Sequence, residues 1–391
     1  MLRATEPPCD DETLLGRLVA FDSTSHRSNL DIADFICDYV ARPGVEILRC
    51  PSPDGSKVNL VLSAGPQDGS RQGLVLSGHM DVVPPGEEAW RSNPFTLAVH
   101  EDSYVGRGVC DMKGFLALAI NRFAELDLKR LRHPLVLVLT YDEEVGTLGA
   151  RHLAETWTAA RPLPSAAIIG EPTSLGVVRM HKGHLRLRLG FTGIPAHSGM
   201  PHLGRNAIEP AGAAIVALTA LRRELEAELS PYSRYFPEVP FVTLNVARVW
   251  GGEAINVVPA HCTIELGVRL LPEMSAAAMT DRVRGAVQHA VGDVPFGLEL
   301  IGESPAMVVA EDAPIHRVLC RELGQQGSQS APYATDAGWL QRLGLDCVLC
   351  GPGSISVAHK PNEFMRVADF ARGGELLKAI VHQLCEFGAQ P

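Results

Sequence analysis

The sequence lacks an excess of positive charge, and this absence excludes two classes of partner. Its 391 residues contain 35 lysines and arginines against 45 aspartates and glutamates, which gives a formal net charge of -10. Nucleic acids and anionic membranes both attract proteins that have a basic surface. We therefore expect no nucleic acid and no membrane as a partner, and we expect an acidic, soluble protein.

Two kinds of apolar segment are also missing. The first residues, MLRATEPPCDDETLL, are acidic where a secretory signal peptide has a cationic and then an apolar stretch. No run of 18 or more apolar residues follows, so the sequence predicts no membrane-spanning helix. The expected location is the cytoplasm.

Cysteine is too sparse and too scattered to predict a disulfide framework. There are nine cysteines, an odd number, and only Cys347 and Cys350 lie close together. Their spacing is compatible with a redox pair or half of a zinc site. The string DCVLCGPG, however, has the pattern of a buried strand, and no second pair follows it. Cys110 is interpreted as a small packed side chain rather than a nucleophile.

The pattern of apolar residues predicts two domains. Hydrophobic residues make up 46% of the chain, which is enough for a large core, and a chain of this length tends to divide. Apolar runs at 58–63, 73–77, 135–140 and 166–169 have the pattern of strands buried on both faces, and helical patterns fall at 11–22, 28–41, 113–128 and 147–158. This alternation predicts a doubly wound α/β domain with a mostly parallel sheet.

The pattern changes from about residue 179. A strand at 184–192, a helix at 205–228, strands at 241–250 and 258–271, a helix at 275–291 and a strand at 296–303 follow in order. This βαββαβ order predicts an inserted ferredoxin-like domain over 179–303. The first domain, 1–178 and 304–391, then resumes with a helix at 313–324, a strand at 346–350 and a helix at 367–386.

Residues that commonly bind metals lie where strands of the first domain end, or just beyond. They are His79, Asp111, Glu144, Glu171 and His359. Imidazole and carboxylate groups suit zinc, cobalt or manganese. Open parallel sheets carry their sites at the carboxyl ends of the strands, which is where most of these residues fall. The sequence therefore predicts a site that binds two metal ions.

The segments around these residues closely resemble a known family. They read GLVLSGHMDVV (73–83), GRGVCDMKG (106–114), LVLVLTYDEEVG (135–146), AAIIGEPT (166–173) and VAHKPNE (357–363). Together they resemble the dinuclear zinc amidohydrolases and peptidases that include acetylornithine deacetylase, succinyl-diaminopimelate desuccinylase and carboxypeptidase G. The resemblance extends from about residue 10 to the C-terminus. GEPT, HKGH (181–184) and AHKPNE (358–363) look most like acetylornithine deacetylase.

The resemblance implies how the metal ligands divide between two sites. Two divalent ions held close together need a carboxylate that binds both, and Asp111 is the candidate for this bridge. By resemblance, His79 and Glu171 complete one site, while Glu144 and His359 complete the other. Asp81 is expected to orient the imidazole of His79 through a hydrogen bond rather than to bind metal.

Glu143 and Glu144 are adjacent acids that need separate roles. The resemblance makes Glu144 a metal ligand, which leaves Glu143 free to act as a general base and acid. Glu143 would take a proton from the attacking water and deliver it to the leaving nitrogen. Metal binding lowers the pKa of water toward 7, so a carboxylate of modest basicity is sufficient.

The inserted domain and the last part of the chain contribute the other candidate residues. His197 lies in a loop rich in Gly, Pro and Ser, and in the family the corresponding His reaches the partner subunit's active site and binds the substrate carbonyl oxygen. Asn256 and Arg269 occupy the family's positions for binding the substrate α-carboxylate. Arg269 could also be only the polar face of an edge strand. Thr335 and Gly353 are expected on loops that contact substrate.

The resemblance implies an enzyme that hydrolyses the amide bond of an N-acyl-amino acid and forms a homodimer through its inserted lid domain. N-acetylornithine is the expected substrate; another N-acyl-amino acid, N-succinyl-diaminopimelate or a short peptide is the alternative. The sequence differs from acetylornithine deacetylases at Asp336, where they usually have Glu, and at Lys360, where they often have Gln. A zinc-binding protein without catalysis is a further alternative, although metal binding alone would not require Glu143 beside Glu144.

Overall fold

The computed structural model describes residues 8–87, 89–158 and 162–387. Contacts divide the chain into two compact units. Unit 1 comprises Met1–Arg179, Val309–Gln329 and Thr335–Pro391, and unit 2 comprises Met180–Val308 and Ser330–Ala334. Unit 2 is thus an insertion into the sequence of unit 1. Among the described residues, no helix has the length and apolar character needed to cross a membrane.

Unit 1 is built on a mixed sheet in which the central strands are parallel. Its strands lie in the order β1 (Val45–Pro51), β2 (Val58–Ala64), β6 (Leu135–Thr140), β3 (Leu74–His79), β7 (Ala166–Ile169) and β15 (Asp346–Leu349). β3 is parallel to both β6 and β7, and β15 is parallel to β7. β1 and β2 are antiparallel to their neighbours. The next strand, β8 (Val178–His181), continues into unit 2 and pairs there with β13 (Met307–Val308).

Helices cover both faces of this sheet. Every residue of β3 and β6 is buried, as expected for strands covered on two sides. Leu60 and Leu62 of β2 pack in one core with α1 (Asp11–Val19), α2 (Leu30–Val40), α3 (Lys113–Ala124) and α9 (Val367–Val381). Asn59, on the opposite face of β2, donates a hydrogen bond to Gly149 of α4 (Leu148–Thr156). The unit is therefore a three-layer α/β structure.

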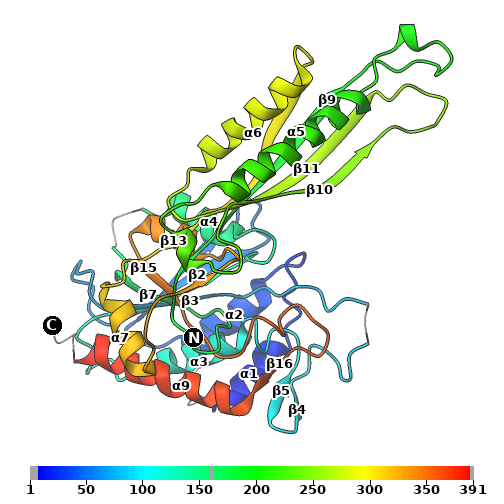
Figure 1. The fold of residues 1–391 in the computed structure, drawn as a ribbon. Coiled ribbons are helices and arrows are strands. Elements are labelled where there is room, and N and C mark those ends of the chain that lie inside the picture. Colours follow the sequence, from blue (N-terminus) through cyan, green and yellow to red (C-terminus); the bar gives the residue numbers. More distant parts are fainter. Residues whose placement is uncertain (1–7, 88, 159–161, 388–391) are drawn as a thin grey trace. The chain divides into compact units, whose positions relative to one another are not determined.

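Unit 2 has an antiparallel sheet with two helices on one face. The strand order is β10 (Thr243–Gly251), β11 (His261–Leu270), β9 (Gly183–Thr192) and β12 (Phe296–Ser304). Side chains alternate between the faces of β9, so Leu185, Leu187 and Leu189 are buried in a core with α5 (Ile208–Ala227) and α6 (Ala276–Val291). Figure 1 shows these two helices running side by side along the sheet. The chain order is βαββαβ, which is ferredoxin-like.

The predicted fold class is confirmed in both units. The differences concern β1, a strand of seven residues that was not predicted, and several short or irregular elements. The helix expected at 11–22 ends at Val19, and the helix expected at 367–386 continues beyond Val381 as a π-helical turn over His382–Glu386. A small sheet of β4 (Ala98–His100), β5 (Ser103–Val105) and β16 (Phe364–Arg366) was not predicted, since strands of three residues leave almost no periodic pattern.

Candidate metal centre

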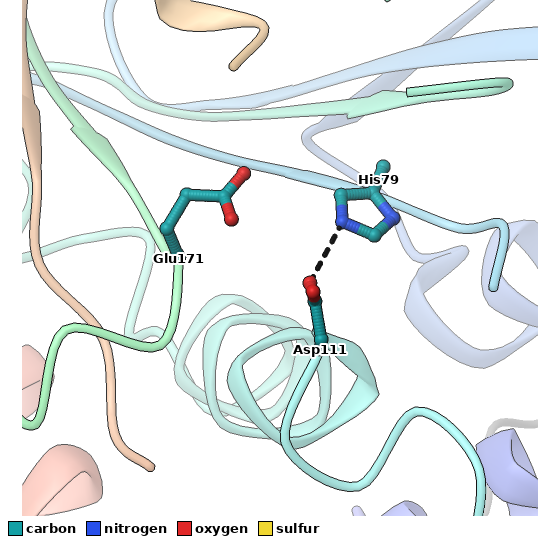
Figure 2. A group of neighbouring side chains, drawn as sticks. All are labelled: His79, Asp111 and Glu171. Atoms are coloured by element: carbon teal, nitrogen blue, oxygen red, sulfur yellow. Dashed lines mark hydrogen bonds and ion pairs between the residues drawn. The ribbon is translucent and has the colours of Figure 1, made fainter. Parts of the chain in front are cut away.

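Two groups of side chains that could hold a metal ion form in unit 1, and they share one carboxylate. The first group is His79, Asp111 and Glu171, whose side chains converge on a common space in Figure 2. The second group is Asp111, Glu144 and His359. In each group the ligand atoms lie within 4.8 Å of one another. Asp111 therefore belongs to two candidate sites at once.

The sheet topology explains why these residues meet. His79 is the last residue of β3, and Glu171 and Glu144 follow the ends of β7 and β6. Both of those strands are parallel neighbours of β3, so the three residues emerge at one edge of the sheet. Asp111 immediately precedes the residue that caps the N-terminus of α3. His359 lies in the turn before β16 and has a positive φ of 62°.

The two carboxylate oxygens of Asp111 face different partners. Its Oδ1 lies 3.1 Å from Nε2 of His79, and its Oδ2 lies 3.2 Å from Nε2 of His359. The same nitrogen of His359 lies 2.9 Å from Oε2 of Glu144. His79 and Asp111 are buried, whereas the His359 side chain is half exposed. This is the arrangement that a carboxylate bridging two cations requires.

The donor set fits divalent metal ions. Three carboxylates and two imidazoles are oxygen and nitrogen ligands of the kind that zinc, cobalt and manganese accept. Within the described residues, Oε1 of Glu144 and Oε1 of Glu171 are buried and have no hydrogen-bond partner. A buried carboxylate oxygen without a partner is costly, and a cation in contact with it would remove that cost.

The electrostatics of the cluster also favour bound divalent metal ions. Burial and the charge of Asp111 raise the pKa of Glu171 well above its usual range, and the same two causes raise the pKa of Glu144 to about 7. Hydrogen bonds to Asp111 and Glu144 raise the pKa of His359 to about 10. The protein has gathered more negative charge here than it neutralises with its own groups. Bound cations would favour the charged form of every carboxylate in the cluster.

Asp81 orients His79 with its main chain. Its side chain holds the turn that carries Glu143 and Glu144, which we call the acid turn. Nδ1 of His79 donates to the backbone carbonyl of Asp81 at 2.9 Å, which leaves Nε2 facing Asp111. The Asp81 carboxylate lies 3.6 Å from that Nδ1, beyond a hydrogen bond. It instead accepts bonds from the backbone N–H groups of Glu143 (3.1 Å) and Glu144 (3.3 Å). Asp81 thus links the turn that carries Glu144 to the end of β3, which carries His79.

Glu143 lies beside the ligand groups without belonging to either. Burial and the negative charge of Glu171 raise its pKa well above the usual range for a glutamate, although the side chain keeps some exposure to solvent. The backbone of its turn is fixed by Asp81 and by Asp142, which has a φ of 54° and forms an ion pair with Lys57. The turn therefore presents a carboxyl group of raised pKa next to the candidate metal ligands.

The candidate residues of the insertion all lie in unit 2. His197 is exposed, its Nδ1 accepts a bond from the N–H of Gly199, and its backbone pairs with Val257. Asn256 is exposed in the neighbouring loop, and its carbonyl accepts a bond from the N–H of Ser198. The two loops therefore support each other. Arg269 lies on β11, where it is partly buried and pairs with His184 of β9, rather than on an edge strand.

The candidate residues near the end of the chain are packed into unit 1. Thr335 is buried, and its hydroxyl accepts a bond from the N–H of Ala337. Asp336 is buried as well and accepts a bond from the Thr140 hydroxyl. Gly353 has a φ of 80°, and a Cβ there would lie 2.5 Å from Sγ of Cys110, so packing alone requires a glycine. Lys360 is exposed.

Cys110, Cys347 and Cys350 have the properties of packed, unreactive side chains. All nine cysteines are free. Cys347 and Cys350 are buried within and directly after β15, and burial raises the pKa of the Cys350 thiol to about 12 and that of Cys347 further. Burial likewise raises the pKa of Cys110. Reactive cysteines need a lowered pKa, so nothing here supports a redox function.

Two buried groups that support the ligands were not predicted. The hydroxyl of Ser25 donates to the Asp81 carboxylate at 2.7 Å. Glu363 accepts backbone hydrogen bonds from the segment that ends at Asp111. Ser25 carries no signal in the sequence. Glu363 lies in the string AHKPNE, where its only signal is an acid four residues after His359.

The model of the family described as Peptidase family M20/M25/M40 matches residues 75–383. Aminopeptidase PepT from Bacillus cereus has a similar structure, with a TM-score of 0.73 and 20% identity over 96% of this chain and 99% of that one. At this level of identity the similarity concerns the fold.

Two further solved structures are similar over almost their whole length. An M20 family metallo-carboxypeptidase from Sulfolobus solfataricus has a TM-score of 0.74 at 17% identity, covering 96% of this chain and 99% of that chain. A dinuclear metal binding peptidase of the M20 family from Bacillus subtilis has a TM-score of 0.64 at 15% identity, covering 95% and 97%. The two-unit architecture is thus shared with these proteins.

Proposed function

The chain belongs to Peptidase family M20/M25/M40, and we propose that it is a hydrolase that uses two divalent metal ions to cleave an amide bond. One observation carries the proposal. The two oxygens of Asp111 face separate ligand groups, with a carboxyl group of raised pKa, Glu143, next to them. A site that only bound metal would not need this additional acid.

In this proposal the ligands divide as the geometry groups them. His79 and Glu171 would hold one ion, Glu144 and His359 would hold the other, and Asp111 would bridge both. Asp81 would keep His79 and the acid turn in place. When bound, the ions would supply a Lewis acid for the substrate carbonyl and would acidify a water molecule toward neutral pH. Zinc is the preferred candidate, and cobalt or manganese suits the same ligands.

Glu143 would move the protons of the reaction. Its carboxylate would accept a proton from the attacking water, and the resulting carboxylic acid would donate that proton to the leaving nitrogen. The raised pKa supports this assignment, because a carboxylate whose basicity is increased by burial and by the charge of Glu171 accepts a proton from water more readily. The electron pair of the broken C–N bond would leave with the nitrogen as that proton arrives.

We propose that residues of unit 2 bind the substrate. The exposed His197 would donate a hydrogen bond to the carbonyl oxygen of the scissile amide in the partner subunit of a homodimer. Arg269 and Asn256 would bind a carboxylate of the substrate, since a guanidinium can form two parallel charge-assisted bonds to it.

In unit 1, Thr335 and Gly353 would line the substrate site. Their burial and packing give each residue a structural reason as well.

The proposed substrate is an N-acyl-amino acid, with N-acetylornithine as the first choice. GEPT, HKGH and AHKPNE are the segments that favour it. A short peptide is the second candidate, because the similar structures include an aminopeptidase and a metallo-carboxypeptidase. N-succinyl-diaminopimelate and other N-acyl-amino acids complete the set.

A hydrolysis panel tests the proposed function. The zinc- or cobalt-loaded protein would be offered N-acetylornithine, N-acetylmethionine, N-succinyl-diaminopimelate and a dipeptide. The Glu143→Gln variant is the control, because it should still bind metal and so measures the hydrolysis that occurs without Glu143. We expect one substrate to be cleaved far faster than the others, and N-acetylornithine to be that substrate. Preferential cleavage of the dipeptide would assign the chain to the peptidases instead. No cleavage of any amide by the metal-loaded chain would contradict the proposed hydrolase.

A further inference from the structure

The carboxylate of Glu363 is fully enclosed by donors from one short segment. Its Oε1 accepts bonds from the backbone N–H groups of Cys110 (2.8 Å) and Asp111 (3.0 Å). Its Oε2 accepts bonds from the N–H of Gly108 (3.0 Å) and from the guanidinium of Arg107 (2.7 Å). Glu363 and Arg107 are each only 1% exposed. One carboxylate thus holds nearly the whole backbone that leads to Asp111.

This contact joins two segments that are far apart in the sequence. Glu363 ends the turn that carries His359, and its backbone carbonyl also accepts a bond from the N–H of Gly106. The turn is held in an unusual shape, with a φ of 62° at His359 and of 58° at Asn362, whose side chain accepts a bond from the N–H of Arg91. A single carboxylate therefore sets where the Asp111 backbone lies relative to the turn that carries His359.

We propose that Glu363 is a positioning residue of the metal centre, which fixes the backbone of residues 108–111 so that the two oxygens of Asp111 face the two ligand groups. The proposal rests on the two-metal function proposed above and adds a residue that would not itself touch metal or substrate. The N–H of Asp111 is one of the four bonds, so a shift of the carboxylate would move the bridging residue directly. Groups that hold a ligand in place commonly change metal affinity by about 10- to 100-fold when they are removed.

Glu363→Gln is the first test. A glutamine at this position would turn its NH2 group toward backbone N–H groups that also donate, so at least one pair of the present bonds must break. We expect the variant to fold and to bind metal about 10- to 100-fold more weakly than the wild type. Competition against a chromophoric chelator, with zinc and then cobalt as the metal, measures this affinity. The visible absorption of bound cobalt should also change, since its ligand geometry would change.

Two more variants separate positioning from general stability. Glu363→Asp keeps the charge but is one methylene shorter and cannot keep all four bonds, so it should weaken metal binding too; it carries the test if the glutamine variant does not fold. Asp11→Asn is the matched control, because Asp11 accepts bonds from Asn121 (2.8 Å) and Arg122 (3.1 Å) of α3 rather than from residues 107–111. This control should lower stability in the presence of chelator without changing metal affinity.

The outcomes distinguish this proposal from the proposed function. If the wild type binds two ions and the Glu363 variants bind them with unchanged affinity and cobalt spectrum, the positioning role is wrong and the hydrolase stands. The same conclusion follows if the Glu363 variants differ from the wild type only in stability, as Asp11→Asn is expected to do. A wild-type chain that binds no metal would overturn both proposals together.

Discussion

At the scale of single residues, the adjacent glutamates Glu143 and Glu144 have identical side chains but different surroundings, which give them different expected roles. Glu144 belongs to a ligand group through its contact with His359, and burial together with the negative charge of Asp111 raises its pKa. Glu143 belongs to no ligand group, and burial together with Glu171 raises its pKa. The backbone N–H of each is held by Asp81, so a substitution of either side chain leaves the shape of the turn supported.

We predict that substitution of Glu143 and substitution of Glu144 impair different properties of the protein. Glu143→Gln should keep both metals and lose about 10²- to 10⁴-fold in turnover, because it removes the proton carrier alone. Glu144→Gln should lose metal affinity first, because it removes a ligand. A metal titration run beside turnover measurements compares the two variants. If Glu143→Gln bound fewer metals and Glu144→Gln did not, the assigned roles would be reversed.

The sequence predicted these residues better than it predicted what holds them. The candidate ligands could be named because most of them sit in recognisable strings at strand ends, and the structure brings them together in two groups. The orientation of the Asp81 carboxylate toward the acid turn, and the four bonds to Glu363, depend on backbone N–H groups from distant segments. Side-chain identity says nothing about which backbone groups will be nearby, so such contacts had to come from the structure.

At the scale of elements, the strands that position the site were predicted because they are buried on both faces. β6 and β7 are apolar over nearly their whole length and β3 begins with the apolar run LVL, and their parallel pairing puts their ends at one edge. β8 was not expected as a strand of this sheet. Its sequence VRMH mixes charged and apolar residues although all four are buried, so no pattern marks it.

The junction of β8 and β9 carries two histidines that burial keeps neutral. Burial, together with the positive charge of Arg269, lowers the pKa of His181 to about 4 and that of His184 to about 4. Arg186 acts on His184 in the same direction. In the unfolded chain an imidazole has a pKa near 6.5, so the unfolded state takes up protons first as the pH falls. These groups therefore contribute stability above about pH 6.5 that is lost as the pH falls toward 4.

We predict that His181→Gln flattens the dependence of stability on pH. His181 is fully buried, so protonation of this residue in the unfolded chain should lower the wild type's free energy of unfolding by about 2 kcal/mol between pH 7 and pH 5. The variant lacks this group, so the difference between the two proteins should shrink or reverse over the same interval. Urea unfolding at both pH values measures it, with the exposed His26→Gln as the control. An unchanged difference would show that His181 is not kept neutral by burial.

At the scale of the whole molecule, the two units differ in what they contribute. Unit 1 contains both ligand groups and Glu143, and unit 2 contains His197, Asn256 and Arg269. Chain order and periodicity were enough to predict the fold class of each. They could not establish which copy of the chain a His197 side chain serves, because that depends on association between chains.

We predict that two inactive variants rescue each other in a mixed dimer. Glu143→Gln and His197→Ala should each lose about 10²-fold or more in turnover. In a mixed dimer, the intact Glu143 lies in the His197→Ala chain, which would receive a working His197 from its partner. Random mixing makes about half of the dimers mixed, each with one good site of two, so recovered activity should approach about a quarter of wild type.

A mixture that exchanges subunits and stays inactive would mean that His197 serves its own chain or takes no part in catalysis. Size-exclusion chromatography with multi-angle light scattering supplies the control, since a monomeric chain would contradict the dimer directly.

The most direct test of the two-metal account is removal of metal followed by stepwise return. The protein is treated with a chelator, its metal content is checked by elemental analysis, and zinc or cobalt is added back in measured amounts while hydrolysis of the best panel substrate is followed. We predict that chelation abolishes hydrolysis and that activity is restored in full at about two ions per chain. Hydrolysis that persists after verified removal of metal would contradict the account.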